Sequence, residues 1–248
     1  MILHIPHAST LIPYSDGFCC SAERLASEIQ LLTDHYTDEL FFRQDSVIIQ
    51  SPCSRIFCDM ERFADDAMEP NSHLGMGVLY THADNGDVLR VVTPELRSKI
   101  LDEYYYPHHQ RLTEAVDMEL RSNGRACIID CHSFPDQPLE RDADRRGDRP
   151  DFNIGTDPFH TPHEWLEKSV DFFANRGYSL GMDWPYTGSI VPMKHYRNDS
   201  QVLSIMLEVN RRMYMDEITG ERLPEFLSVQ RIVQDYVSMI HSMLHGIS

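Results

Sequence analysis

The sequence lacks the features that mark membrane-spanning, exported and disulfide-stabilised proteins. It has no run of about 18 apolar residues, so no transmembrane helix is expected. The first residues, MILHIPHAS, have neither the basic region nor the long apolar segment of a signal peptide, which favours a cytoplasmic protein. Its six cysteines include no CxxC pair, so we expect reduced thiols.

Positive charge is also scarce. The chain has 22 Lys and Arg residues against 39 Asp and Glu residues, which gives a formal net charge of −17. Such an acidic surface repels phosphate backbones and anionic lipids, so neither nucleic acid nor a membrane surface is an expected partner. If the substrate is a small anion, a few locally placed arginines must receive it.

What remains is an ordinary globular composition. Of the 248 residues, 42% are apolar and 25% are charged. A chain of this size can bury a sizeable core without disulfide or metal cross-links, and its composition excludes disorder as the main state. Because no repeat, low-complexity stretch or linker interrupts it, residues 1–248 are expected to form a single domain.

Strand and helix patterns alternate along the chain. Strands are expected at 2–6, 46–50, 126–130, 151–155, 178–183 and 201–209, and helices at 21–42, 94–105, 107–122, 162–176 and 223–245. Thr93-Pro94 starts the longest helical stretch, which Pro107 is expected to kink or divide. A hairpin is expected around Asn85-Gly86. The alternation predicts an α/β fold with a mostly parallel mixed sheet and helices on both faces.

Polar residues stand near the ends of three of these strands. His7 follows the first strand, Asp130 and His132 end the strand at 126–130, and Glu208 ends the strand at 201–209. In open α/β sheets, ligands bind beyond the carboxyl ends of the strands. Imidazole nitrogens and carboxylate oxygens bind zinc, and a further carboxylate can take a proton from water. The pattern is therefore typical of a metal-dependent hydrolase.

Each of these residues also has a simpler interpretation. His7 after a proline can be a loop histidine, and His132 can be a structural cap. Glu208 is the strongest single signal, because burying a carboxylate beside an apolar strand is costly unless it is paired or functional.

Seven segments taken together resemble the N-formylglutamate amidohydrolases. They are HIPHAS (4–9), LLTDHYTDEL (31–40), SRIFCDMER (54–62), IIDCHS (128–133), RPDFNIGT (149–156), YTGSIVPMKHY (186–196) and MLEVNRRMYM (206–215). They occur in the family's order and at family-like spacing. The resemblance implies a zinc-peptidase-like, phosphorylase/hydrolase-like α/β fold related to the carboxypeptidases. It also implies hydrolysis of N-formyl-L-glutamate to formate and L-glutamate in histidine catabolism.

The resemblance further implies roles for individual residues. Its blocks place metal ligands at His7, Asp34 and His132, with His35 as the alternative to Asp34. Asp34 could instead be a helix-face carboxylate paired with an arginine. Glu208 falls where the carboxypeptidases have their general base. The expected cofactor is a zinc ion, and manganese, iron or cobalt remain open.

Arginines are expected to decide the substrate, because a bidentate guanidinium is the usual receiver of a carboxylate. Arg55 is expected to be catalytic by stabilising the transition state. The expected substrate-binding residues are Arg62, Asn153, Thr156, His195, Tyr196 and Arg212. The substrate expected from these features is a small anionic N-acyl amino acid.

Two departures from the family leave the exact substrate open. The chain has Asp59-Met60-Glu61-Arg62 where the family usually has Asp-Leu-Asn-Arg, and its loop 135–150 does not align with the family. Glu61 adds a negative charge beside the arginines expected to hold carboxylates. The alternatives are a carboxypeptidase-like enzyme, another N-acyl amino acid deacylase, or a catalytically silent binding protein. The joint presence of His7, His132 and Glu208 argues against the silent protein, since a binder needs no general base.

Overall fold

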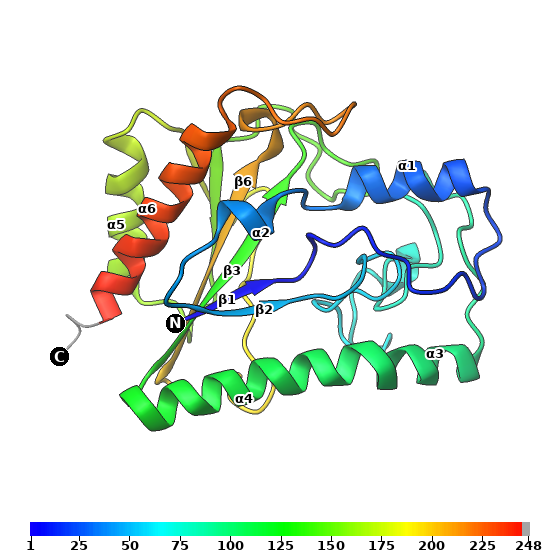
Figure 1. Cartoon of the computed structure of the whole chain (residues 1–248), viewed down its shortest axis with the longest axis horizontal. Coiled ribbons are helices and arrows are strands. Elements are labelled where there is room, and N and C mark those ends of the chain that lie inside the picture. The colour runs from blue at the N-terminus through cyan, green and yellow to red at the C-terminus, as the bar shows by residue number, and fades with distance from the viewer. Residues whose placement is uncertain (245–248) are drawn as a thin grey trace.

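The computed structural model describes residues 1–244, and a six-stranded sheet runs through its centre (Figure 1). The strands are β1 (Ile2–Ile5), β2 (Val47–Gln50), β3 (Ala126–Phe134), β4 (Phe152–Gly155), β5 (Leu180–Met182) and β6 (Val202–Asn210), in the order β2-β1-β3-β6-β4-β5. All neighbouring pairs are parallel except β4 and β6, which are antiparallel. The expected mostly parallel mixed sheet is confirmed.

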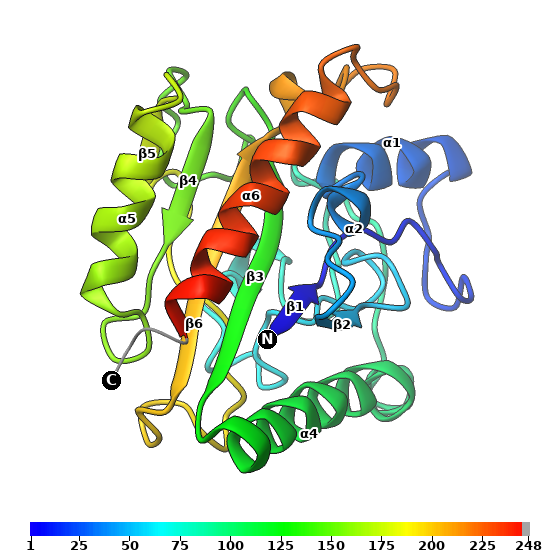
Figure 2. The ribbon, with the colours of Figure 1, turned by 60° about the vertical axis from the view of Figure 1, so that its left-hand side comes forward.

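Helices cover both faces of this sheet. The α-helices of the described chain are α1 (Ala22–Leu32), α2 (Thr37–Leu40), α3 (Pro94–Ile100), α4 (Tyr106–Asn123), α5 (His163–Ala174) and α6 (Phe226–Leu244), and α4, α5 and α6 pack on the sheet. Residue 245 of the expected last helix lies outside the described residues. Figure 2 shows α5 and α6 side by side over the sheet, where Trp165 and Val233 belong to the same buried core as Ile129. On the opposite face, α4 packs Leu112 and Val116 against the strands.

The two central strands are buried along their whole length. Every residue of β3 and of β6 is buried, because helices shield them on both faces. This explains why their sequences read as nearly continuous apolar runs. Polar residues within them, such as Asp130, His132 and Glu208, are therefore held away from solvent and need partners or a function.

The single helix expected at 21–42 is divided in the structure. Ser21 caps α1 by accepting a hydrogen bond from the backbone N–H of Arg24, and α1 ends at Leu32. Tyr36 then takes a left-handed conformation with φ of 66° at the start of α2. Between the two helices, the N–H of Asp34 donates to the carbonyl of His7 at 3.0 Å. The break therefore fastens Asp34 beside the end of β1.

Two other local expectations are met. A π-helical turn at Leu101–Tyr105 separates α3 from α4, whose first turn contains Pro107. The wider turn accommodates the residue that lacks an N–H and would clash within a regular helix. At Asn85-Gly86 the chain reverses, with Gly86 at φ of 91° and an antiparallel bridge between His82 and Val88.

Every helix within residues 1–244 is too short or too polar to cross a membrane.

Candidate active site

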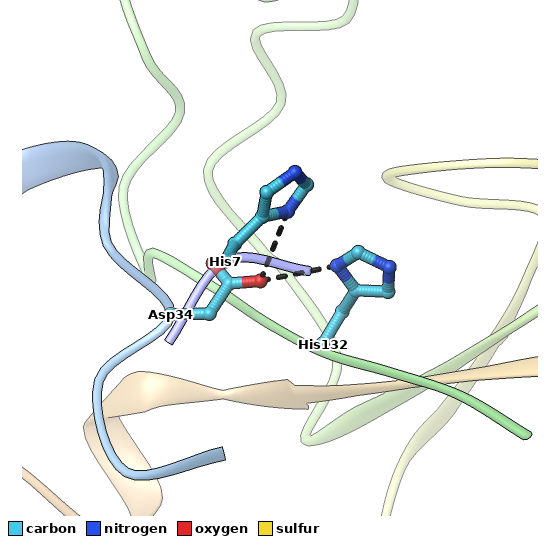
Figure 3. Close-up of side chains that lie close together, drawn as sticks. All are labelled: His7, Asp34 and His132. Carbon is cyan, nitrogen blue, oxygen red and sulfur yellow. Dashed lines mark hydrogen bonds and ion pairs between the residues drawn. The ribbon is translucent and has the colours of Figure 1, made fainter. Parts of the chain in front are cut away.

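Three side chains from distant parts of the sequence converge at the carboxyl edge of the sheet (Figure 3). His7 follows β1, Asp34 lies between α1 and α2, and His132 belongs to β3. The Asp34 Oδ2 atom lies 3.1 Å from His132 Nδ1 and 3.6 Å from His7 Nδ1. One nitrogen or oxygen from each residue lies within 4.8 Å of the other two, and all three residues are buried. His35, the alternative to Asp34, instead directs Nε2 to the carbonyl of Gln30.

The chemistry of this group fits a zinc ion. Two imidazole nitrogens and one carboxylate oxygen are the ligand types that zinc accepts in catalytic sites. The His7 Nδ1 atom is buried and has no hydrogen-bond partner in the described part of the chain. A buried nitrogen left without a partner carries a cost that a bound cation would relieve.

Carboxylates contact both histidines at Nε2, the ring nitrogen that does not face Asp34. His7 Nε2 lies 2.8 Å from Asp59 Oδ1, and His132 Nε2 lies 3.1 Å from Glu61 Oε2 and 3.2 Å from Asp130 Oδ1. Burial lowers the pKa of His132, but Glu61 and Asp130 outweigh it and raise that pKa well above its usual range. Such carboxylates fix the orientation of a ligand imidazole and increase its basicity.

An arginine holds the Asp34 carboxylate in place in a similar way. Arg211 Nη2 donates to Asp34 Oδ1 at 2.8 Å, while its Nε donates to Ser133 Oγ at 3.2 Å. Burial raises the pKa of Asp34, but His132, His7 and Arg211 together hold it well below its usual range. One oxygen of Asp34 therefore faces the histidines, and the other pairs with an arginine.

Glu208 lies beside this group on the neighbouring strand. It stands opposite His132 in the register of β3 and β6 and is only 5% exposed. Its Oε2 atom has no hydrogen-bond partner in residues 1–244. Burial raises the pKa of Glu208 to about 8, which His132 opposes and Asp34 and Glu61 reinforce. A carboxylate with such a pKa can both accept and return a proton near neutral pH.

The raised pKa of Glu208 makes a prediction about stability. Its folded pKa of about 8 exceeds the ordinary value of 4.5, so the folded state holds this proton more tightly than the unfolded state. The resulting stabilisation is complete below the unfolded pKa and is lost as the pH rises through the folded one. We expect Glu208→Gln to weaken the decline in unfolding free energy across this window, measured by urea titration with a chelator present. If the unfolding free energies of both proteins depended on pH to the same extent, the raised pKa of Glu208 would be contradicted.

These residues line a cleft of about 710 Å³. Arg55 enters it while donating Nε and Nη2 to Asp59 Oδ2 at 3.2 and 3.0 Å. Arg62 also lines the cleft, and its buried Nε has no hydrogen-bond partner among the described residues. The cleft therefore contains the three converging side chains, Glu208 and two of the arginines expected at the site.

A buried arginine holds the segment that carries these groups. Arg90 donates from its guanidinium to the carbonyl oxygens of Ile56, Phe57 and Tyr80 at 3.1 to 3.2 Å. These bonds fasten residues 54–62, which contribute Arg55 and the carboxylates behind the histidines. The segment has little regular structure, so side-chain donors take the place of a sheet or helix ladder.

The structure places five expected substrate contacts outside the lining of the cleft: Asn153, Thr156, His195, Tyr196 and Arg212. The Asn153 side chain donates to the carbonyl of Tyr186 and accepts from the N–H of Trp184, which fixes the turn after β5. Thr156 donates to Asp183 in the same turn. These two residues shape a loop near the cleft.

The other three residues also have structural partners. His195 lies 3.0 Å from Asp117 on α4, and Arg212 donates to Asp136 and Asp151. Tyr196 stacks on His160 and lines a smaller neighbouring pocket. Of the expected substrate-binding residues, the cleft itself contains Arg62.

The structure places Asp59, Glu61 and Arg211 against the converging side chains, which was not expected from the sequence. The sequence suggested Glu61 only as a charge that affects the substrate, and Arg211 only as one of several arginines near the catalytic residues. Asp59 stood between two arginines in SRIFCDMER, and Arg211 stood three residues after Glu208. Those spacings were visible in the sequence, but neither identifies which atom each residue contacts.

The chain is similar to known proteins in sequence and in fold. A sequence profile described as N-formylglutamate amidohydrolase matches residues 1–215. The crystal structure of N-formylglutamate amidohydrolase from Ralstonia eutropha JMP134 superposes with a TM-score of 0.87 at 22% identity, covering 99% of this chain and 94% of that chain. A gene product from Agrobacterium tumefaciens gives 0.67 at 15% identity, covering 97% and 91%. None of the curated protein sequences matches the chain. At these identities the two structures support a shared fold.

Proposed function

The chain belongs to the N-formylglutamate amidohydrolase family, and we propose that it is a metal-dependent enzyme that cleaves the amide bond of a small N-acyl amino acid. N-formyl-L-glutamate, which would give formate and L-glutamate, is the first substrate to test. The observation that carries the proposal is the convergence of His7, Asp34 and His132 in a cleft that also contains Glu208, whose Oε2 atom has no hydrogen-bond partner among residues 1–244.

The converging side chains would hold the metal, most simply zinc, with manganese, iron or cobalt as alternatives. The ligand atoms would be His7 Nδ1, Asp34 Oδ2 and His132 Nδ1. A metal bound by three protein groups lowers the pKa of a water molecule and polarises a carbonyl. Asp59 would keep His7 oriented through the hydrogen bond at its other nitrogen.

Glu208 is the proposed general base and, later, the general acid. Its carboxylate would accept a proton from the attacking water as the oxygen bonds to the amide carbon. It would then return this proton to the amine nitrogen as the carbon–nitrogen bond breaks, so that a carboxylic acid and an amine leave, and the acid then ionises in water. The raised pKa of Glu208 suits both transfers.

Arg55 is proposed to stabilise the negative charge that develops on the carbonyl oxygen. We expect Arg55→Lys to lower kcat by about 10²–10³-fold, because lysine lacks the planar fork that can hold Asp59 and still face the cleft. Steady-state kinetics would be compared with Arg97→Lys, a control that removes an arginine paired with Asp66 outside the cleft. A raised KM with unchanged kcat would instead identify Arg55 as a residue that binds the ground state.

A formate-release assay tests the proposed function. Purified protein would be supplied with N-formyl-L-glutamate after chelation and again after zinc is restored. We expect formate only with the metal present. A protein that binds stoichiometric metal yet hydrolyses no N-acyl amino acid would contradict the proposal and support a silent binding protein.

A further inference from the structure

The cleft has few cationic groups to offer a substrate with two carboxylates. Within residues 1–244, its lining includes no lysine and four arginines: Arg55, Arg62, Arg141 and Arg211. Arg211 uses all three guanidinium nitrogens, donating to Asp34, Ser133 and the carbonyl of Leu31. Arg141 donates to the backbone carbonyls of Asp84 and Leu74. Both are therefore occupied within the protein.

Of the two other arginines of the cleft, one has a guanidinium group that is available to a substrate carboxylate. Arg55 commits Nε and Nη2 to Asp59 at 3.2 and 3.0 Å. Arg62 approaches Asp59 and Glu69 only at 3.9 Å, and its buried Nε has no hydrogen-bond partner in the described chain. Bidentate recognition needs two free nitrogens on one guanidinium. The arginines of the cleft can therefore bind one substrate carboxylate, and Arg62 is the residue that would bind it.

A second substrate carboxylate would meet negative charge. Glu61 adjoins Arg62 and lines the cleft, and the carboxylate of Asp34 lines it as well. Like charges close together in a partly buried site repel each other strongly. The glutamate side chain of N-formyl-L-glutamate therefore has no evident cationic receiver.

A largely apolar pocket lies beside the cleft. A pocket of about 340 Å³ shares Glu61, Arg62, Thr187 and Met206 with the cleft. Beyond this shared wall most of the lining is apolar or aromatic, from Met60, Phe63, Tyr105, Ile190, Val191, Met193 and Tyr196, and the remainder comes from His109, Asp130, Gly188 and Ser189. Asp130 also reaches it, but its carboxylate already engages His4 and the N–H of Ile190. Such a pocket favours burial of an aliphatic or aromatic group.

We propose that the enzyme selects N-acyl amino acids with one carboxylate and an apolar side chain over N-formyl-L-glutamate. Arg62 holds the carboxylate, and the pocket beyond Met206 and Thr187 receives the side chain. This inference rests on the proposed amide hydrolysis and narrows its substrate class.

A substrate series tests the selection directly. Formate release by the metal-loaded enzyme would be measured with the N-formyl derivatives of L-leucine, L-glutamine, L-alanine and L-glutamate. We expect kcat/KM for the leucine derivative to exceed that for the glutamate derivative by about tenfold or more, since burial of a leucine side chain is worth at least that ratio. A preference for the glutamate derivative, or equal rates on all four, overturns the inference while leaving the hydrolytic function standing.

Two variants test whether this pocket and Glu61 determine the substrate preference. Val191→Phe narrows the pocket and should lower the leucine-to-alanine ratio of kcat/KM by about tenfold, whereas Val170→Phe, an exposed position on α5, should keep the wild-type ratio. Glu61→Gln should raise the glutamate-to-leucine ratio by removing the repulsion. Unchanged ratios in both Val191→Phe and Glu61→Gln overturn the assignment to this pocket.

Turnover of none of the four substrates would contradict the proposed function instead. Titration calorimetry with the same four compounds then still decides the inference, because binding does not need catalysis. Tighter binding of the leucine derivative supports the pocket, and tighter binding of the glutamate derivative overturns it.

Discussion

Replacing Glu208 with glutamine is expected to lower kcat by about 10²–10⁴-fold while the protein keeps its bound metal. Glutamine preserves the size of the side chain and its capacity to accept a hydrogen bond, but it cannot take a proton from water. The expectation depends on the placement of Glu208, which is buried opposite His132 with one oxygen unpaired. Because Glu208 is not among the three converging ligand atoms, its loss should leave metal content unchanged.

The matched control is Glu28→Gln. Glu28 is also buried, but it accepts a hydrogen bond from the N–H of Asp84 and lies outside the lining of the cleft. We expect this variant to retain wild-type kcat. Wild-type turnover of Glu208→Gln on any amide substrate would show that the base is another residue, and Glu61, beside His132, would be examined next.

The part of the site that lies on strands could be predicted from sequence. In a parallel sheet the carboxyl ends of neighbouring strands meet at one edge, so polar residues near those ends must come close together. His7, His132 and Glu208 were expected to converge for this reason. They do so because β1, β3 and β6 are consecutive neighbours in the sheet, and the registers of these strands leave little freedom in where their side chains lie.

The groups outside the sheet could not be placed in this way. Residues 51–92 include only a 3₁₀ turn and no α-helix or sheet strand, and Arg90 fastens the part around Phe57 through carbonyl contacts more than 30 positions away in sequence. Hydrophobic periodicity does not report such contacts. The pairing of Asp59 with His7 and of Glu61 with His132 therefore became visible only in three dimensions.

Membership of a family-like segment did not by itself place a residue in the lining of the cleft. Asn153 and Arg212 both lie in such segments, yet their polar atoms hold a turn and two loop carboxylates. Arg211, one position earlier, supports Asp34 instead. A residue can belong to the pattern because it positions the site, and the sequence pattern alone does not separate this role from binding.

Replacing His132 with alanine is expected to reduce metal affinity by more than the roughly 10–100-fold that loss of an outer partner typically costs. The substitution removes one of three converging ligand atoms. Asp59→Asn offers the graded comparison, because it changes the carboxylate behind His7 and leaves all three ligand side chains in place, so its effect should stay within that range. Metal content would be measured by elemental analysis after dialysis against buffered zinc. Circular dichroism would verify that each variant is folded.

His35→Ala is the matched histidine control for this prediction. His35 neighbours Asp34 in sequence but directs its ring to the backbone of Gln30, so its removal should leave metal content at the wild-type level. Binding to the wild-type protein should also weaken at acid pH, since a ligand imidazole must be neutral. Full metal occupancy in His132→Ala, or loss of metal in His35→Ala alone, would move the site away from the three converging side chains. The first result would exclude His132 as a required metal ligand, and the second would identify His35, in place of Asp34, as the third metal ligand.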